Sequence, residues 1–148
     1  MAPFRFSLQR VLDIRQQQEE QARLDVAQAQ ARYQHQVAVT EAARRRQAKH
    51  KEAWLRQSQR GVNKHEFWLH QTYAVSLERE VQTAEAEMLQ LAKELNARRR
   101  VLVERAKATK LLEKLKLRQG IRHAEEEQLQ ERKQFDETAT IRYRPADF

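Results

Sequence analysis

The sequence predicts an all-α fold in which two long helices form an antiparallel coiled-coil hairpin with its turn near Gly61. The composition is typical of long helices, because charged residues make up 34% of the 148 residues while Gly and Pro number two each. Gly61 lies near the middle of the chain and is followed by apolar residues spaced three and four apart. These observations predict one corner and a narrow helix–helix seam rather than a thick hydrophobic core.

The first helix is expected over residues about 4–58, followed by a turn over residues 59–63. Positions spaced three and four apart along this helix form one face, and eight of its fifteen positions are apolar. Several of them are alanine, which lets a second helix approach closely. The face comprises Leu8, Leu12, Arg15, Glu19, Ala22, Val26, Ala29, Tyr33, Gln36, Thr40, Ala43, Gln47, His50, Trp54 and Gln57.

Local signals at the turn agree on one helix boundary. Gly61 can take the left-handed conformation that ends many helices, and Asn63 is a suitable N-cap for the next helix. Glu66 then stands at the third helical position, as in a capping box. Val62 and Phe67 occupy the two positions of a hydrophobic staple.

The second helix is expected over residues about 64–137. Its clearest feature is a series of apolar positions at coiled-coil spacing, where burying one large side chain contributes roughly 1.5–3 kcal/mol. The series continues less regularly through Leu102, Leu111, Leu112 and Leu115. Its regular part consists of Ala74, Leu77, Val81, Ala84, Met88, Leu91 and Leu95.

Folding the chain back at Gly61 places residue i roughly opposite residue 122 − i, because the two helices rise equally per residue. Trp54 then faces Trp68. Two arginine triplets come level with acidic residues, namely Arg44, Arg45 and Arg46 with Glu78 and Glu80, and Arg98, Arg99 and Arg100 with Glu19, Glu20 and Asp25.

The same register sets the start of the first helix, near Phe4, opposite residue 118. From about Gly120 onwards the second helix is therefore expected to overhang its partner. The overhanging stretch can continue the helix, bend at the glycine or stay partly disordered, and residues 140–148 are expected to form a frayed tail. Residues 121–148 carry seven acidic against five basic side chains, so this end is acidic in a basic chain.

Features of enzymes and cofactor sites are missing from the sequence. Two paired helices offer no water-poor cleft, the chain has no glycine-rich phosphate loop, and it has no cysteine. His65 and His70 are five residues apart, not the four of zinc-binding helices, so the histidines are expected to be solvated. We therefore expect no catalytic residue, no cofactor and no metal. No apolar run approaches the ~20 residues that span a bilayer, and the lack of cysteine agrees with a cytoplasmic location.

Aromatic side chains near the turn allow two interpretations. Phe67 falls on the seam, whereas Trp68 lies about 100° around the helix from it and Tyr73 lies one position before Ala74. Trp68 can pack on Trp54 as a lid over the end of the hairpin. Alternatively, Trp68 and Tyr73 can be exposed anchors for a partner.

Both ends of the chain resemble the FliJ family. The stretch "FRFSLQRVLDIRQQQEEQARLDVAQAQ", residues 4–30, is similar to the family's N-terminal pattern, and "LLEKLKLRQGIRHAEEEQLQERKQFDETA", residues 111–139, is similar to its C-terminal pattern. FliJ is a small cytoplasmic component of the bacterial flagellar type III protein-export apparatus. The resemblance implies an antiparallel coiled coil like the central stalk subunit of rotary ATPases, and a non-enzymatic role.

Partners also follow from the resemblance. It implies that the chain sits in the pore of the hexameric export ATPase FliI, contacts the cytoplasmic domain of the export gate FlhA and handles export chaperones. It implies a location at the inner membrane of the flagellar base that is reached through partners only. The stretch "EFWLHQTYAVSLEREV" resembles the family's gate-contacting region, which assigns that contact to Phe67, Trp68, Tyr73 and Leu77.

The helix ends are expected to contact the ATPase ring. By the same resemblance, the start of the first helix lies in the ring beside the overhang of the second. The acidic side chains of the overhang can meet basic loops there. The residues assigned to ring contact are Phe4, Phe6, Leu8, Glu125, Glu126 and Glu127.

Two other functions remain open from the sequence. The stalk protein of a virulence type III secretion system shares the architecture, although the N-terminal Phe-x-Phe-x-Leu pattern favours the flagellar system. A basic coiled coil with a net charge of +8 can also bind nucleic acid. Because no aromatic residues are interleaved with the arginine triplets and acidic residues lie level with them, we expect structural pairing and no nucleic-acid partner.

Overall fold

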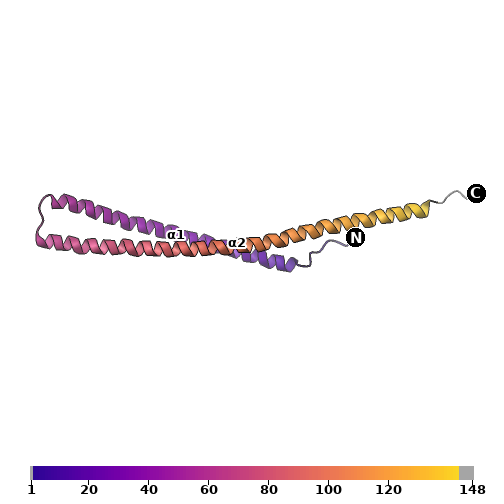
Figure 1. Cartoon of the computed structure of the whole chain (residues 1–148), viewed down its shortest axis with the longest axis horizontal. Coiled ribbons are helices and arrows are strands. Elements are labelled where there is room, and N and C mark those ends of the chain that lie inside the picture. Colours follow the sequence, from indigo (N-terminus) through magenta and orange to yellow (C-terminus); the bar gives the residue numbers. More distant parts are fainter. Residues whose placement is uncertain (1, 144–148) are drawn as a thin grey trace, which may run out of the picture. The chain divides into compact units, whose positions relative to one another are not determined.

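Two helices account for nearly all of residues 2–143, the part of the chain that the computed structural model describes (Figure 1). Helix α1 spans Gln9–Ser58 and helix α2 spans Lys64–Arg142. Within residues 2–143 there is no strand. The helices run antiparallel and pack against each other, since side chains of α1 bond to the backbone and side chains of α2. The prediction of an all-α antiparallel hairpin is confirmed.

The chain divides into two compact units, which we describe separately. The turn unit comprises Glu20–Val103 and contains the turn and the flanking parts of both helices. The terminal unit comprises the residues up to Glu19 and those from Glu104 onwards.

The turn matches its sequence signals. Gly61 has a φ of +93°, and Asn63 caps α2 by accepting a hydrogen bond at Oδ1 from the backbone N–H of Glu66, at 2.8 Å. The backbone N–H groups of Arg60 and Gly61 donate to the carbonyls of Gln57 and Ser58 and close the end of α1. Because Gly61 needs the left-handed conformation, any side chain at this position would be strained.

The seam of the turn unit follows the predicted spacing. Four buried α1 positions lie seven residues apart, and the α2 positions at the centre of the series are buried or half-buried. This narrow seam of alanine against leucine and valine forms the core of the unit. Its buried residues are Ala22, Ala29, Gln36, Thr40 and Ala43 in α1, and Leu77, Val81, Ala84 and Leu95 in α2.

Two polar side chains in this seam are buried but satisfied. The amide of Gln36 donates to the carbonyl of Ala84 at 3.2 Å. The hydroxyl of Thr40, which is fully buried, lies 2.9 Å from the carbonyl of Gln36 and 3.2 Å from that of Ala84. Buried polar groups with partners avoid the desolvation cost of unpaired ones. These bonds also fix the axial position of one helix against the other.

The register agrees with the fold-back prediction to within about two residues, as the Gln36–Ala84 and Thr40–Ala84 bonds show. Ion pairs confirm it in part. Arg46 contacts Glu80 at 3.3 Å and Arg98 contacts Asp25 at 3.8 Å, as expected. The other predicted partners are wrong for Arg44, which bonds to Glu85, and for Arg45, which contacts Glu41 in its own helix.

The ends of the helices differ from the expected bounds. Helix α1 begins at Gln9 rather than near residue 4, and its first N–H donates to the carbonyl of Phe6 at 3.0 Å. Residues 2–6 form a non-helical segment, which we call the N-terminal arm. Helix α2 ends at Arg142 rather than near residue 137. Of the expected frayed tail, residues 140–142 are therefore helical, and residues 144–148 lie outside the described part of the chain.

The seam of the terminal unit depends on residues that the apolar pattern did not single out. Thr109 is 3% exposed, and its hydroxyl lies 3.3 Å from the carbonyl of Arg15. Leu111, which we expected on the seam, is 70% exposed, whereas Leu112 is half-buried. The difference arises because Leu112 lies three residues after Thr109 and so shares its side of the helix. Leu111 points about 100° away from Leu112, toward solvent.

Gly120 lies within α2, so the helix continues through the glycine. The ring of Phe4 in the N-terminal arm packs over it, and a Cβ at position 120 would lie 3.6 Å from the nearest ring atom. The N-terminal arm therefore covers α2 at the point where we expected it to lose its partner.

Replacing Gly120 with alanine is expected to stabilise the protein by about 0.5–1 kcal/mol. Alanine favours the helix at an interior position, and a separation of 3.6 Å from Phe4 is ordinary van der Waals contact. Urea unfolding followed by circular dichroism measures the change. A loss of stability would show that Phe4 needs the glycine surface itself.

Candidate functional site

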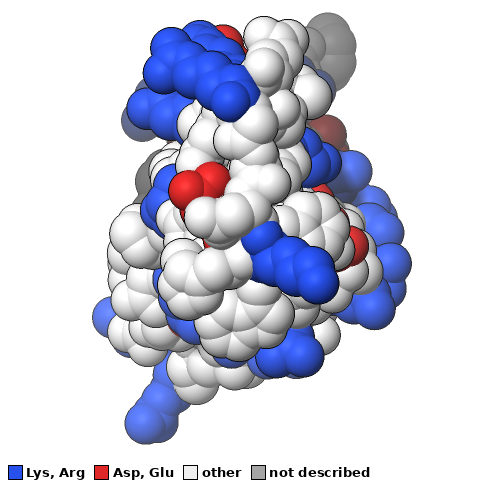
Figure 2. Space-filling view, turned by 90° about the vertical axis from the view of Figure 1, so that its left-hand side faces the viewer, with Lys and Arg blue, Asp and Glu red and all other residues white. Residues whose placement is uncertain are grey.

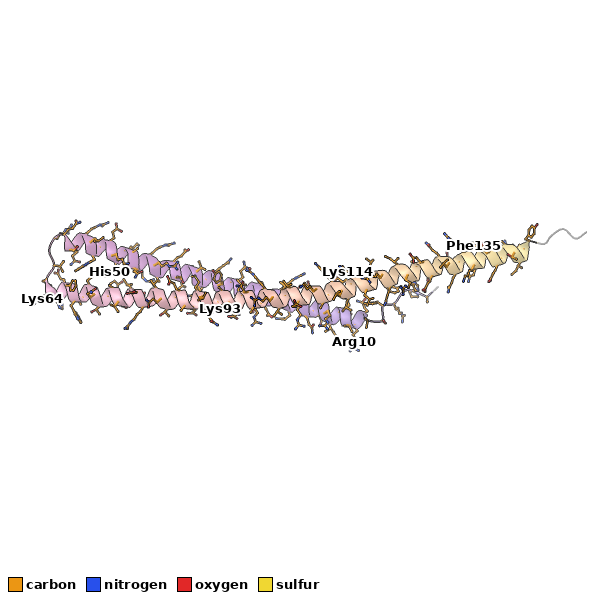
Figure 3. The ribbon with its side chains drawn as sticks, viewed as in Figure 1. Arg10, His50, Lys64, Lys93, Lys114 and Phe135 are labelled. Carbon is orange, nitrogen blue, oxygen red and sulfur yellow. The ribbon has the colours of Figure 1, made fainter. Side chains whose placement is uncertain are left out.

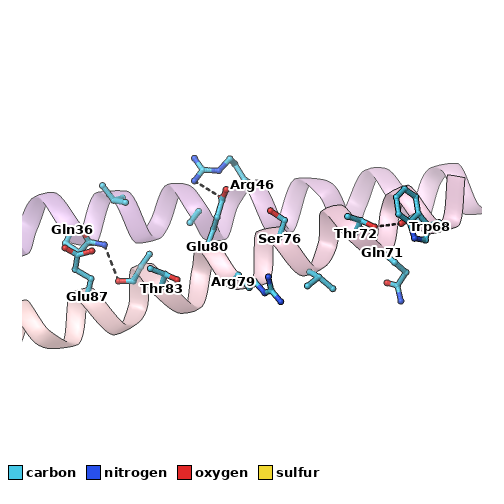
Figure 4. A pocket seen from close by; sticks show the side chains of 14 residues that line it. Gln36, Arg46, Trp68, Gln71, Thr72, Ser76, Arg79, Glu80, Thr83 and Glu87 are labelled. Atoms are coloured by element: carbon cyan, nitrogen blue, oxygen red, sulfur yellow. Dashed lines mark hydrogen bonds and ion pairs between the residues drawn. The ribbon is translucent and has the colours of Figure 1, made fainter. Parts of the chain in front are cut away.

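A groove in the turn unit lies between α1 and α2 and encloses about 880 Å³ (Figure 4). The exposed side chains of Trp68 and Val75 from α2 and Val39 from α1 supply its apolar surface. The Arg46–Glu80 ion pair crosses between the helices in the same region. The groove is elongated and holds few convergent polar groups, so it suits a segment of another protein better than a reacting small molecule.

Three of the four side chains assigned to gate contact are accessible. Trp68 is 61% exposed, Phe67 is 53% exposed and Tyr73 is 50% exposed. Phe67 still touches the seam, since its ring centroid lies 6.1 Å from that of Trp54.

Leu77, the fourth residue assigned to gate contact, is buried. Its side chain is 2% exposed and belongs to the centre of the seam. A surface role for Leu77 is therefore wrong for this fold, because the residue lies on the helix face that packs against α1. The sequence showed this position on the regular apolar series, which is the signal for a core residue.

The end of the hairpin is closed by a stack of rings rather than by a pair of tryptophans. Trp54 stacks on His70 with ring centroids 3.8 Å apart, and His70 stacks on His50 at 4.5 Å. Tyr73 meets His50 edge-on. The lid of Trp54 on Trp68 is thus wrong, because the register brings His70 opposite Trp54 and leaves Trp68 on the surface.

The expectation of solvated histidines is also wrong for His50 and His70. Nε2 of His50 and Nδ1 of His70 are buried without a hydrogen-bond partner. Burial lowers the pKa of His70 below its usual 6.5, and the neighbouring His50 lowers it further. The sequence contained a signal for both, since His50 lies on the face of the first helix and His70 lies four residues before Ala74.

The His70 stack is expected to make stability depend on pH. Because the pKa of His70 is lower in the folded protein than in the unfolded chain, its contribution is complete above pH 6.5. It is lost as the pH falls below 6.5 and through the folded pKa, since the unfolded chain then binds more protons. Urea unfolding of the wild type and of His70→Phe, which keeps a ring in the stack, should show a smaller loss on acidification in the variant. An equal loss in both proteins would place the dependence elsewhere.

The terminal unit brings the N-terminal arm onto the acidic part of α2. Phe6 is 6% exposed, and the ring of Phe4 lies 5.6 Å from that of His123. Ala2 lines a small pocket together with residues of α2 as far as Gln134. The stretch of α2 directly after Gly120 therefore has a partner within the chain, contrary to the prediction that it has none.

The residues assigned to ring contact differ in accessibility. Leu8 is 37% exposed, whereas Phe6 is buried and can act only by holding the arm. Glu125 and Glu126 are exposed, and Glu127 lies 3.9 Å from Nε2 of His123. From residue 132 to residue 143 every side chain is exposed, including Phe135 at 76% (Figure 3). The overhang thus begins about a dozen residues later than expected.

No group of three metal-ligating side chains lies together among residues 2–143, and none of the described helices is long and apolar enough to cross a membrane. The arginine triplets are largely engaged with carboxylates, since Arg44, Arg46 and Arg98 each contact an acid on the opposite helix. This pairing favours the structural interpretation of the triplets over phosphate binding.

Comparison with known proteins gives one finding that covers both units. The family model FliJ, described as Flagellar FliJ protein, matches residues 4–147. No curated protein and no solved structure matches the chain. The match includes residues 4–6 of the N-terminal arm, the turn and the full length of α2.

Proposed function

The chain belongs to the FliJ family, a component of the flagellar protein-export apparatus, and we propose that it works there as a non-enzymatic stalk and adaptor. In this role it connects the hexameric export ATPase FliI, the cytoplasmic domain of the export gate FlhA and chaperone–substrate complexes. The proposal places it in the cytoplasm at the base of the flagellum, where it supports motility.

The observation that carries the proposal is the difference between the two ends of the hairpin. The terminal unit ends in a helix with exposed apolar side chains on several sides, including Leu129, Phe135 and Ile141. The turn unit presents a groove and exposed aromatic rings. Large exposed apolar side chains gathered in this way are typical of protein interaction sites. Two different surfaces on one coiled coil suit a protein that joins two different partners.

We assign the ATPase ring to the terminal unit. The arm residues and Leu8 lie beside an acidic stretch of α2, and the exposed carboxylates of Glu125 and Glu126 are available for basic loops of a ring. A single asymmetric helix pair contacts the subunits of a hexamer unequally, which can favour ring assembly and bias the order in which its sites turn over. The chain itself then needs no nucleotide chemistry.

We assign the gate and the chaperones to the turn unit. Trp68 and Tyr73 lie on different sides of α2, and the groove extends along α2 from Trp68 to Glu87. Exposed aromatic side chains frequently contribute most of the energy of a protein interface. Leu77 has no part in this contact because it is buried.

The test is a titration of the full chain into the cognate export ATPase without nucleic acid at physiological salt. We expect co-purification, formation of hexamers and saturable stimulation of ATP turnover. Glu125→Gln with Glu126→Gln should weaken the stimulation, whereas the matched exposed pair Glu78→Gln with Glu87→Gln in the turn unit should not. Absence of both binding and stimulation would contradict the stalk function.

The two alternative functions predict different results when the same purified protein is tested for ATPase stimulation and for DNA binding. A stalk from a virulence secretion system would stimulate the ATPase of that system in preference to the flagellar one. A nucleic-acid-binding protein would bind DNA with an affinity that falls steeply with salt. The family match supports the flagellar system over a virulence system. The ion pairs of Arg46 and Arg98 with acidic residues support a structural role of these arginines over nucleic-acid binding.

A further inference from the structure

The tip of the turn unit, which we define as residues 49–71, combines exposed apolar side chains with an excess of cations. Leu55 is 64% exposed, Trp68 is 61% exposed and Leu69 is 50% exposed. These values are high for large apolar residues so close together. Trp68 lies at one end of the groove and none of the three belongs to the buried seam of Leu77, so at least half of each side chain is left uncovered.

The apolar side chains of the tip do not share one helix face. Trp68 and Leu69 are consecutive and therefore point about 100° apart, and Leu55 lies on the other helix. A single protein segment in the groove beside Trp68 would leave Leu55 and Leu69 uncovered, because neither lines that groove. Apolar side chains distributed around the end of the hairpin can all be buried at once when that end enters a lipid bilayer.

Charges at the tip are predominantly positive. Residues 49–71 contain five lysines and arginines against two glutamates. Glu52 is already paired with Arg56 at 2.7 Å, whereas Lys49, Lys51, Arg60 and Lys64 have no ion pair within the described residues. Figure 2, which looks onto the turn, shows an uncharged surface flanked by Lys and Arg with little Asp or Glu in view.

We propose that this tip inserts into the headgroup region of an anionic lipid bilayer. Leu55, Trp68 and Leu69 enter the boundary between headgroups and acyl chains, and the long side chains of Arg60 and Lys64 extend back to the anionic headgroups. Tryptophan is favoured at this boundary because one part of its ring system is apolar and its N–H needs a polar partner. The contact adds to any attachment through partner proteins and does not depend on the proposed stalk function.

The dimensions of the tip fit this insertion. Leu69 is the sixth residue of α2 and Leu55 is the fourth from the end of α1, so both lie within about 8 Å of the helix ends at 1.5 Å per residue. Peripheral helices bury their apolar side chains to a depth of about 5–10 Å. Each cation near an anionic surface strengthens binding about fivefold.

Vesicle binding of the full chain tests the proposal. The two tryptophans of the chain, Trp54 and Trp68, both lie in the tip and act as built-in fluorescent probes. We expect binding and a blue shift of the emission with vesicles of phosphatidylcholine and phosphatidylglycerol. With phosphatidylcholine alone, or at high salt, both should be lost. Trp68→Phe should remove most of the shift, because Trp54 is already packed on His70.

Matched variants separate the tip from other basic or apolar surfaces. Arg60→Gln with Lys64→Gln should weaken vesicle binding roughly 30-fold, whereas Arg99→Gln with Arg100→Gln removes the same charge from the same unit and should have little effect. Leu55→Ser with Leu69→Ser should weaken it at least about tenfold, whereas Leu89→Ser with Val101→Ser should not. All eight side chains are exposed, so the fold should persist.

Three results would overturn the proposal. The first is no binding of the wild type to anionic vesicles at low salt. The second is that Arg99→Gln with Arg100→Gln weakens vesicle binding as much as Arg60→Gln with Lys64→Gln does. The third is a Leu55→Ser, Leu69→Ser protein that loses binding to the gate domain but keeps vesicle binding, since the patch would then serve a protein. Stimulation of the export ATPase, measured on the same variants, should stay unchanged and so reports separately on the stalk function.

Discussion

Replacing Leu77 with alanine is expected to lower the free energy of unfolding by about 2–4 kcal/mol. Among residues 2–143, Leu77 and Thr40 are the largest side chains that are fully buried, and both lie in the seam of the turn unit. A seam between two helices has only two sides and cannot collapse around a cavity as a thick core can. The loss should therefore be large for a single truncation, and urea unfolding monitored by circular dichroism measures it.

Leu89→Ala is the matched control, because Leu89 is 59% exposed on the same helix. Its expected effect is within about 0.5 kcal/mol, the usual range for surface substitutions. Equal stability of the Leu77 variant and the wild type would contradict the seam. If that variant stayed fully stable but lost binding to the gate domain, Leu77 would be a surface contact after all.

Replacing Phe4 and Phe6 with alanine is expected to raise the concentration needed for half-maximal ATPase stimulation at least about tenfold. Phe6 is 6% exposed and Phe4 packs over Gly120, so both hold the N-terminal arm on α2 beside the acidic stretch. Without the two phenyl side chains the arm is no longer held on α2. The surface proposed to contact the ATPase then consists of the acidic stretch of α2 alone. A titration into the export ATPase measures the change.

Leu24→Ala serves as the control for this experiment, since Leu24 is 51% exposed and lies in the turn unit. Binding to the gate domain should be unaffected in both proteins. Unchanged stimulation by the Phe4 and Phe6 variant would show that the arm has no part in the ring contact. Loss of both activities would indicate a general loss of structure, which circular dichroism would detect.

Local signals predicted the turn and the seam well. Gly61 and Asn63 determine the turn through their own backbone preferences, which neighbouring structure hardly changes. Even polar positions such as Gln36 and Thr40 lie where the spacing placed them. An apolar series at coiled-coil spacing has only one way to be buried between two helices, so the spacing alone identifies the face.

Contacts that depend on a shift of one or two residues could not be predicted in the same way. Trp54 stacks on His70 rather than facing Trp68, because a small shift in register exchanges one aromatic neighbour for another. In the terminal unit the seam passes through Thr109 instead of Leu111. A buried threonine has no hydropathy signal, and its position depends on the carbonyls of Arg15 and Arg105 that it meets.

The N-terminal arm shows a second limit of sequence patterns. The spacing of Phe4, Phe6 and Leu8 agrees with an early helix start, yet the first helix begins at Gln9. Burying Phe6 and packing Phe4 over the flat surface of Gly120 compete with that helical turn, and these contacts are long-range. Gly120 lies beneath Phe4 inside a continuous helix, and because a Cβ there would make only ordinary contact with the ring, this packing does not require a glycine.

The central claim is that one molecule doubles back on itself at Gly61. The native chain has no cysteine, so Arg32→Cys with Glu94→Cys provides two unique sites for spin labels at an ion pair across the seam. Pulsed electron paramagnetic resonance should give a single short distance that persists when labelled protein is diluted with unlabelled protein. A distance that is long, or a short one that disappears on dilution, would show helices that pair only between molecules and would contradict the hairpin.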